Sequence, residues 1–120
     1  MAIVAVHALF YTPQPHELRA FLRDVLGWEY VEHPASGPGW LIFKLPPAEL
    51  GVHPSDGSTQ HELSFMCDDI EATMAELRDK GVEFRGEAED MGFGIGITMA
   101  LPGGVELLLY QAKHPSPLDL

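Results

Sequence analysis

The sequence predicts an α+β domain built from two βαβββ repeats. Three observations lead to this prediction. Apolar runs of strand length alternate with two amphipathic helical segments, the order of the elements recurs halfway along the chain, and the 120 residues have the length of one domain. We therefore expect a single domain over residues 1–120, with its repeats at about 3–53 and 61–111.

The first repeat begins with an apolar segment rich in β-branched residues, IVAVHALFY at residues 3–11, which predicts a strand and not a signal peptide. A helix should follow, because Leu18, Phe21, Leu22 and Val25 have the i, i+3, i+4, i+7 spacing of one helical face. Gly27 suits the end of that helix. Further strands are predicted over residues 28–33, 40–45 and 49–53, with a turn at 34–39.

The second repeat has the same order of elements. Asp68 or Asp69 is placed to cap a helix with Ile70, Met74 and Leu77 as its apolar stripe. A strand over residues 62–67 precedes this helix, and Gly81 ends it. Strands are predicted over 82–85, 93–100 and 105–111, with a loop over 86–92. The tail over 112–120 is expected to lie loosely on the surface.

The repeat is also visible in the letters. Residues 22–30 read LRDVLGWEY, and residues 77–84 read LRDKGVEF, with the two LRD triplets 55 positions apart. A generic ferredoxin-like βαββαβ domain is the main alternative, but it has four strands and this chain offers about eight. The paired βαβββ arrangement is therefore favoured.

Composition narrows the class of function. Seven Lys and Arg face eighteen Asp and Glu, a formal charge of −11, which argues against nucleic acid or an anionic membrane as a partner. No apolar run approaches the ~20 residues of a membrane helix. The single cysteine, Cys67, cannot form an intramolecular disulfide, so the expected location is the cytoplasm.

Three segments carry a resemblance to a known family. They are LRAFLRDVLGWEY at residues 18–30, FMCDDIEATMAELRDKGVEF at 65–84, and LPGGVELLLYQ at 101–111. In order and spacing they resemble the first-helix signature, the second-half signature and the last hairpin of the vicinal-oxygen-chelate superfamily. This superfamily includes glyoxalases, bleomycin-resistance proteins and ring-cleaving dioxygenases. The resemblance covers residues 3–111.

The resemblance implies a glyoxalase-like fold, in which the two repeats form a curved mixed-sheet cup with the helices outside. It implies a homodimer that binds a small molecule inside the cup. It also implies either one divalent metal ion on facing strands or, in members that have lost the metal, none.

Three residues are the predicted metal ligands. By the resemblance, His7 falls on the family's first ligand position, although a lone histidine is as often a core or edge residue held by a hydrogen bond. Glu62 falls on the corresponding position of the second repeat, 55 residues later, with His61 as the fallback if the strand carries a bulge. His53 is the third candidate. Such a nitrogen and oxygen set suits Zn²⁺, Ni²⁺, Mn²⁺ or Fe²⁺.

The last strand departs from the family pattern. The position of the usual carboxylate ligand is occupied by Leu108, whereas Glu106 lies one pleat earlier, ~6–7 Å along the strand. Glu106 is therefore the predicted catalytic base, or else, like Glu49, an alternative ligand or a solvated strand end. Trp40, Phe93, Leu108 and Tyr110 are the predicted ligand-packing residues, because they flank the cup in the family pattern.

Three functions remain open at this point. The first is a metal-dependent lyase, isomerase or dioxygenase acting on a small oxygenated compound. The second is a metal-free protein that sequesters a drug or an aromatic compound in an apolar cup, which Leu108 and the aromatic residues favour. A structural or regulatory dimer with a vestigial cup is a third reading. Fold alone does not choose among them.

Overall fold

The computed structural model describes residues 2–32 and 39–120. Most of the predicted turn at 34–39, and His33, lie outside the described residues. The helices and strands are α1 (Pro15–Ala20), the π-helix η1 (Phe21–Val25), β1 (Tyr30–Glu32), β2 (Leu41–Phe43), β3 (Phe65–Cys67), α2 (Ile70–Asp79), β4 (Glu83–Asp90), β5 (Gly94–Ala100), β6 (Glu106–Ala112) and the 3-10 helix η3 (Pro117–Asp119). Across the described ranges, no helix is both long and apolar enough to span a membrane.

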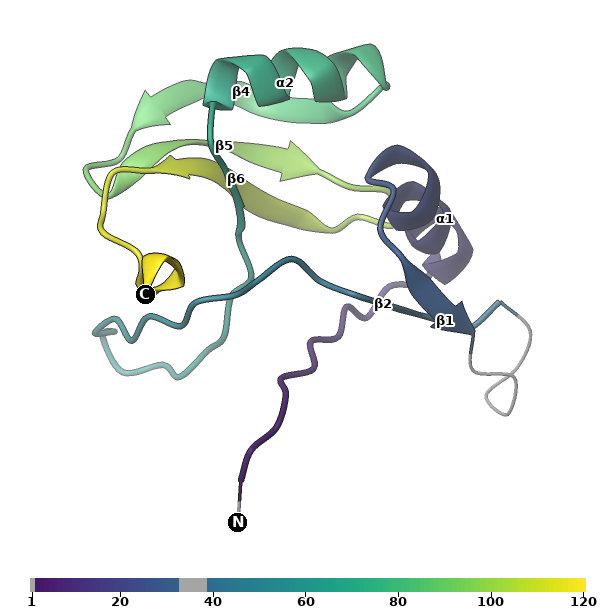
Figure 1. Cartoon of the computed structure of the whole chain (residues 1–120). Helices are drawn as coiled ribbons and strands as arrows, with labels where there is room; N and C mark the ends of the chain where they lie inside the picture. Colours follow the sequence, from purple (N-terminus) through teal and green to yellow (C-terminus); the bar gives the residue numbers. More distant parts are fainter. Residues whose placement is uncertain (1, 33–38) are drawn as a thin grey trace.

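The second half of the chain forms a βαβββ unit. Its sheet has the order β3-β6-β5-β4, with β3 parallel to β6 and the other pairs antiparallel. Helix α2 covers one face of this sheet (Figure 1). The helix begins as predicted, because the Asp69 side chain accepts a hydrogen bond from the Ala72 N–H at 3.0 Å. It ends before Gly81, whose φ of 86° is the left-handed conformation of a helix end.

The hydrophobic core lies between α2 and the sheet. Ile97 and Met99 of β5 are 2% and 0% exposed, and they are paired with Leu109 and Leu107 of β6 on the same face. The predicted stripe of α2 packs against them, and the predicted face of the first helix joins the same cluster. The buried members from the two helices are Leu18, Phe21, Leu22, Ile70, Met74 and Leu77.

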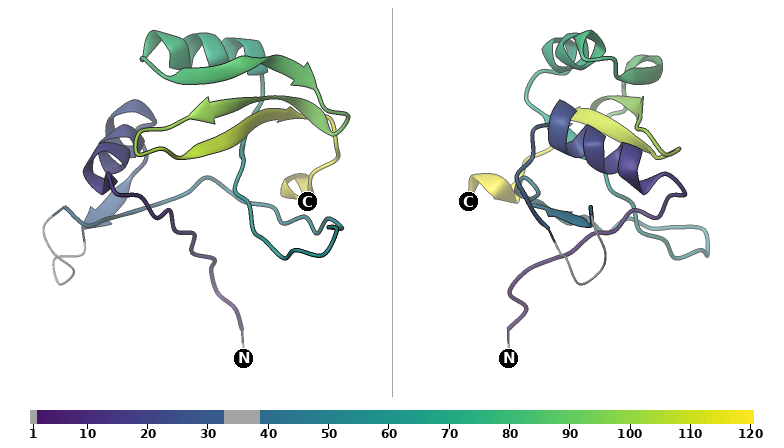
Figure 2. Two further views of the ribbon diagram at one scale, coloured as in Figure 1. Left: turned by 180° about the vertical axis from the view of Figure 1, so that it is seen from behind. Right: turned by 90° about the vertical axis from the view of Figure 1, so that its right-hand side faces the viewer.

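The first half of the chain forms less of its predicted structure. Strands β1 and β2 make an antiparallel hairpin beside α1 and η1, and they form a second, separate sheet. The predicted strands over residues 3–11 and 49–53 do not form, and that over 62–67 shrinks to β3. The reason is that a strand is stable only with a hydrogen-bonded neighbour. Figures 1 and 2 show the N-terminal segment leading away from the sheet.

One strand is longer than predicted. The expected loop over 86–92 is largely part of β4, which continues to Asp90 with a shift of register between Arg85 and Glu89. A bulge of this kind lets the ladder resume past Gly86, a residue that sequence patterns assign to loops. The β4–β5 turn is closed by a hydrogen bond from the Met91 N–H to the Gly94 carbonyl at 2.8 Å.

The other face of the four-stranded sheet is not covered by a helix. Residues alternate between the two faces of a strand, so Gly96 and Thr98 of β5 and Leu108 and Tyr110 of β6 point away from α2. We call this surface the open face. The coil that follows β2 and the C-terminal turn lie on this side of the sheet, opposite α2 (Figures 1 and 2).

Candidate functional site

Two glycines of β5 shape one end of the open face. A Cβ at Gly94 would lie 2.6 Å from the Gln111 carbonyl oxygen and 2.8 Å from Cδ2 of Tyr110. A Cβ at Gly96 would lie 2.9 Å from Cδ1 of Leu108 and 3.1 Å from Cβ of Tyr110. Any larger residue would collide with these atoms. The absence of side chains at Gly94 and Gly96 therefore makes the room in which Leu108 and Tyr110 lie.

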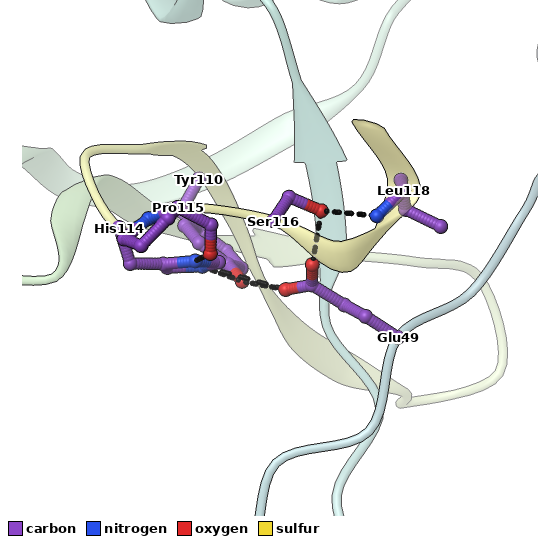
Figure 3. A network of polar contacts seen from close by, with 6 residues as sticks. All are labelled: Glu49, Tyr110, His114, Pro115, Ser116 and Leu118. Atoms are coloured by element: carbon purple, nitrogen blue, oxygen red, sulfur yellow. Dashed lines mark hydrogen bonds and ion pairs between the residues drawn. The ribbon is translucent and has the colours of Figure 1, made fainter. Parts of the chain in front are cut away.

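Tyr110 is the centre of a network of polar side chains (Figure 3). Its hydroxyl lies 3.0 Å from Nε2 of His114 and 3.4 Å from Oε1 of Glu49. The other carboxylate oxygen of Glu49 accepts a hydrogen bond from Oγ of Ser116 at 2.6 Å. Nε2 of His114 also lies 3.4 Å from Oε1 of Glu49. The network therefore joins the coil after β2 to the end of β6 and the tail.

The proton positions follow from the partners of His114. Its Nδ1 lies 2.8 Å from the Pro115 carbonyl oxygen, which can only accept, so Nδ1 carries a proton. In a neutral ring Nε2 is then an acceptor and accepts a hydrogen bond from the Tyr110 hydroxyl. In a charged ring Nε2 donates, and the Tyr110 hydroxyl is free to donate to Glu49. The network accommodates both forms of the histidine.

Burial raises the pKa of the Tyr110 phenol above its usual value, and the nearby Glu49 carboxylate raises that pKa further. The side chain is 8% exposed, and both effects disfavour a phenolate. Because the raised pKa belongs to the folded state, this contribution to stability is complete below pH 10, where an unfolded tyrosine titrates, and is lost as the pH rises through the folded-state pKa. At neutral pH Tyr110 is therefore a hydrogen-bond donor.

The sequence predicts a tail that lies loosely on the surface, and this prediction is wrong. Lys113 and His114 donate backbone hydrogen bonds to the Phe93 carbonyl, and Ser116 caps η3 by accepting from the Leu118 N–H. His114 and Ser116 are functional candidates that the sequence analysis missed. A signal for His114 was present, because continuing the alternation of β6 past Tyr110 and Ala112 places it on the open face.

Three of the four predicted ligand-packing residues meet at this end of the open face. The Phe93 and Tyr110 rings make an edge-to-face pair with centroids 5.3 Å apart, and Leu108 lies against the space above Gly96. Phe93 is 46% exposed, so its ring presents an apolar surface beside the network. Trp40 lies elsewhere, with the Arg19 guanidinium 5.0 Å from its ring centroid.

The predicted metal ligands are dispersed in the single chain. His7, His53 and Glu62 are all exposed and lie outside any helix or strand. Within residues 2–32 and 39–120, no three His, Cys, Asp or Glu side chains come close enough together to hold a metal ion. As placed in one chain, these residues do not fit a metal site.

Glu106, the predicted catalytic base, lies at the opposite end of the open face from Tyr110. It accepts a hydrogen bond from Nε of Arg85 at 2.8 Å, and its side chain is 49% exposed. It lies four positions before Tyr110 on β6, about 13 Å along the strand. Glu106 and the Tyr110 network therefore cannot touch the same small group.

Two hollows lie away from the predicted site. One, of about 330 Å³, lies over the β1–β2 hairpin. The other, of about 650 Å³, lies between the first helix and the start of β4 and includes Phe21, Val25 and Arg85 in its lining. Neither is lined by any residue of the predicted site. The open face of one chain is thus a surface, partly covered at the Tyr110 end.

Comparison with known proteins identifies the family. The model of the Glyoxalase/Bleomycin resistance protein/Dioxygenase superfamily matches residues 5–109. The chain therefore belongs to this superfamily, and the resemblance noted in the sequence is confirmed. A search of curated proteins found no match.

Solved structures agree on the fold. TnmS3, an antibiotic binding protein from Streptomyces sp. CB03234, is 18% identical with a TM-score of 0.64, and the match covers 94% of this chain and 99% of that one. A superfamily member from Sphaerobacter thermophilus is 24% identical with a TM-score of 0.63, covering 91% and 98%. A lactoylglutathione lyase from Agrobacterium tumefaciens is 16% identical with a TM-score of 0.63, covering 90% and 92%. The α+β, glyoxalase-like fold class is confirmed.

Proposed function

We propose that this protein binds a small molecule on the open face, with Leu108, Phe93 and Tyr110 as its packing surface. The observation that carries the proposal is the half-exposed Phe93 ring packed against Tyr110, with Leu108 beside it and one set of polar groups converging on the Tyr110 hydroxyl. Apolar walls with a few placed polar groups are the usual composition of a ligand site. The antibiotic-binding protein among the structural neighbours is consistent with this reading.

A neutral fluorescent probe tests the proposal. We expect phenylnaphthylamine to bind the wild-type protein and Leu108→Glu to weaken that binding at least about tenfold, because the variant places a charge on an apolar surface. The matched control is Leu120→Glu at the fully exposed C-terminal residue, which should bind like wild type. Equal affinity for the probe in Leu108→Glu and Leu120→Glu would refute the assignment of the open face.

We also propose that a second copy of the chain covers the open face. The chain exposes 9033 Å², whereas a compact monomer of 13.2 kDa exposes roughly 6400 Å². Its radius of gyration is 15.7 Å, against about 14 Å for a compact domain of this length. An excess of this size matches what each subunit of an obligate dimer buries.

The exposed area includes apolar side chains of the two segments that were predicted to be strands. Ile3, Val4 and Val6 are 85%, 92% and 89% exposed, and Leu50 and Val52 are 91% and 94% exposed. Pairing with a partner chain would satisfy both their backbone groups and their side chains. Light scattering should give twice the 13.2 kDa of one chain. With one cysteine and this acidic surface, we expect the dimer in the cytoplasm.

A metal-dependent enzyme is the second candidate, favoured by the repeat-related positions of His7 and Glu62. Because His7, His53 and Glu62 do not meet in one chain, any metal site needs a rearrangement or a partner. This second candidate predicts that purified protein soaked in Zn²⁺, Ni²⁺, Mn²⁺ or Fe²⁺ retains one metal per chain and that His7→Ala and Glu62→Ala each lose it. If the metal is lost in His61→Ala but retained in Glu62→Ala, the metal ligand on this segment is His61 and not Glu62. Failure to retain any metal would leave the metal-free binding protein.

A further inference from the structure

Glu49 is partly buried in a segment whose apolar residues are exposed. The other residues from 44 to 62 are exposed, whereas only 17% of the Glu49 side chain is accessible. Its neighbours Leu50 and Val52 are more than nine-tenths exposed. Hydrophobic packing would produce the reverse pattern. This segment is therefore held to the rest of the molecule by recognition of a carboxylate.

The groups that recognise this carboxylate all come from the second repeat. Ser116 Oγ lies 2.6 Å from Oε2, and the Tyr110 hydroxyl and His114 Nε2 each lie 3.4 Å from Oε1. Their positions are set independently of Glu49: Tyr110 by β6, His114 by its bond to the Pro115 carbonyl, and Ser116 by its cap on η3. The subsite belongs to the sheet and the tail, and Glu49 reaches it from the coil after β2.

We propose that Tyr110, His114 and Ser116 form a carboxylate-binding subsite, in which Glu49 stands in for the carboxylate of a small aromatic acid. This inference rests on the proposed binding of a small molecule on the open face. The aromatic part of the ligand is indicated by Phe93, whose half-exposed ring packs edge-to-face with Tyr110 and borders the subsite. Displacement of Glu49 opens the Tyr110 end of the face to the ligand.

The negative charge of the chain does not oppose this binding strongly. The formal charge of −11 is spread over the surface, and charges more than about 8 Å away are largely screened at physiological ionic strength. The nearest carboxylate is that of Glu49 itself, and it leaves the subsite when the ligand enters. Charge-assisted hydrogen bonds from Ser116 and Tyr110 then act on the ligand as they act on Glu49.

Competition between Glu49 and a free acid provides the test. Phenylacetate and its neutral isostere phenylacetamide are titrated into wild type, Glu49→Ala and Glu49→Gln, with calorimetry as the readout. We expect phenylacetate to bind Glu49→Ala roughly tenfold more tightly than wild type, because the internal competitor, held by one or two hydrogen bonds, is gone. Glu49→Gln should show a gain of the same sign, and Ser116→Ala added to Glu49→Ala should remove it. The gain for phenylacetamide should be smaller, because a neutral amide does not accept charge-assisted hydrogen bonds from Ser116 and Tyr110.

Two outcomes would overturn the inference. One is the same phenylacetate affinity in wild type and both Glu49 variants, and the other is an equal gain for phenylacetamide. The phenylnaphthylamine measurement on the same variants separates this failure from failure of the proposed function. Binding of the neutral probe without a carboxylate preference leaves a small-molecule binding protein that lacks this subsite. If the wild-type protein does not bind phenylnaphthylamine either, the open face is not a binding site and the proposed function fails.

Discussion

Met99→Ala should destabilise the protein by about 2–5 kcal/mol, the usual cost of truncating a fully buried methionine. Met99 is 0% exposed and lies in the core cluster formed by α2 and the sheet, where it pairs with Leu107 of β6. Truncation leaves a cavity that the close-packed strands cannot fill. We expect the melting temperature to fall by roughly 10 °C or more, measured by circular dichroism or calorimetry.

Met91→Ala is the matched control, since the same side chain is removed at a site that is 40% exposed in the β4–β5 turn. It should change the free energy of unfolding by no more than about 0.5 kcal/mol. If Met99→Ala were as mild as Met91→Ala, the core would not lie between α2 and β5, and the orientation of the open face would have to be reversed.

Gly94→Ala should destabilise the protein by about 1–3 kcal/mol, the usual cost of overpacking. The added Cβ would lie 2.6 Å from the Gln111 carbonyl oxygen, which is backbone and cannot turn aside, and 2.8 Å from the Tyr110 ring. Either β5 and β6 separate or Tyr110 moves. Chemical denaturation measures the loss of stability, and the tyrosine absorbance titration reports whether Tyr110 becomes exposed and loses its raised pKa.

Gly51→Ala provides the comparison for this substitution. No atom lies within 4 Å of a Cβ built at Gly51, and its φ is not in the left-handed region. We expect a change within about 0.5 kcal/mol of zero in the free energy of unfolding. Equal stability of the Gly94 and Gly51 variants would show that β5 does not need glycine to accommodate Tyr110.

Elements with strong local signals were predicted from the sequence alone. The stripe of Ile70, Met74 and Leu77 and the Asp69 cap define α2, and the observed helix has both. The strands β5 and β6 lie within a residue of their predicted ranges. Apolar periodicity, capping and turn residues act over a few positions, so they can be read without knowledge of the tertiary structure. The grouping of Tyr110, Leu108 and Phe93 was implied by the family resemblance and not by these local signals.

Elements that depend on distant partners were not predictable in this way. Residues 3–11 have the composition of a strand, but a strand needs a neighbour, and the single chain supplies none. The Tyr110 network joins residues 61 and 67 positions apart in the sequence, Glu49 with Tyr110 and Glu49 with Ser116. No local pattern indicates such a contact. The pairing of Glu106 with Arg85, 21 positions away, is likewise a result of strand register.

The sequence by itself therefore determined the family, the α+β class and the helices. These follow from periodicity and from ordered motifs that act locally. Only the tertiary structure decided which polar groups converge on Tyr110, how far Glu106 lies from them, and which predicted strands lack a partner. Those depend on hydrogen bonds and contacts between remote segments, whose geometry is set by the register and packing of the whole sheet.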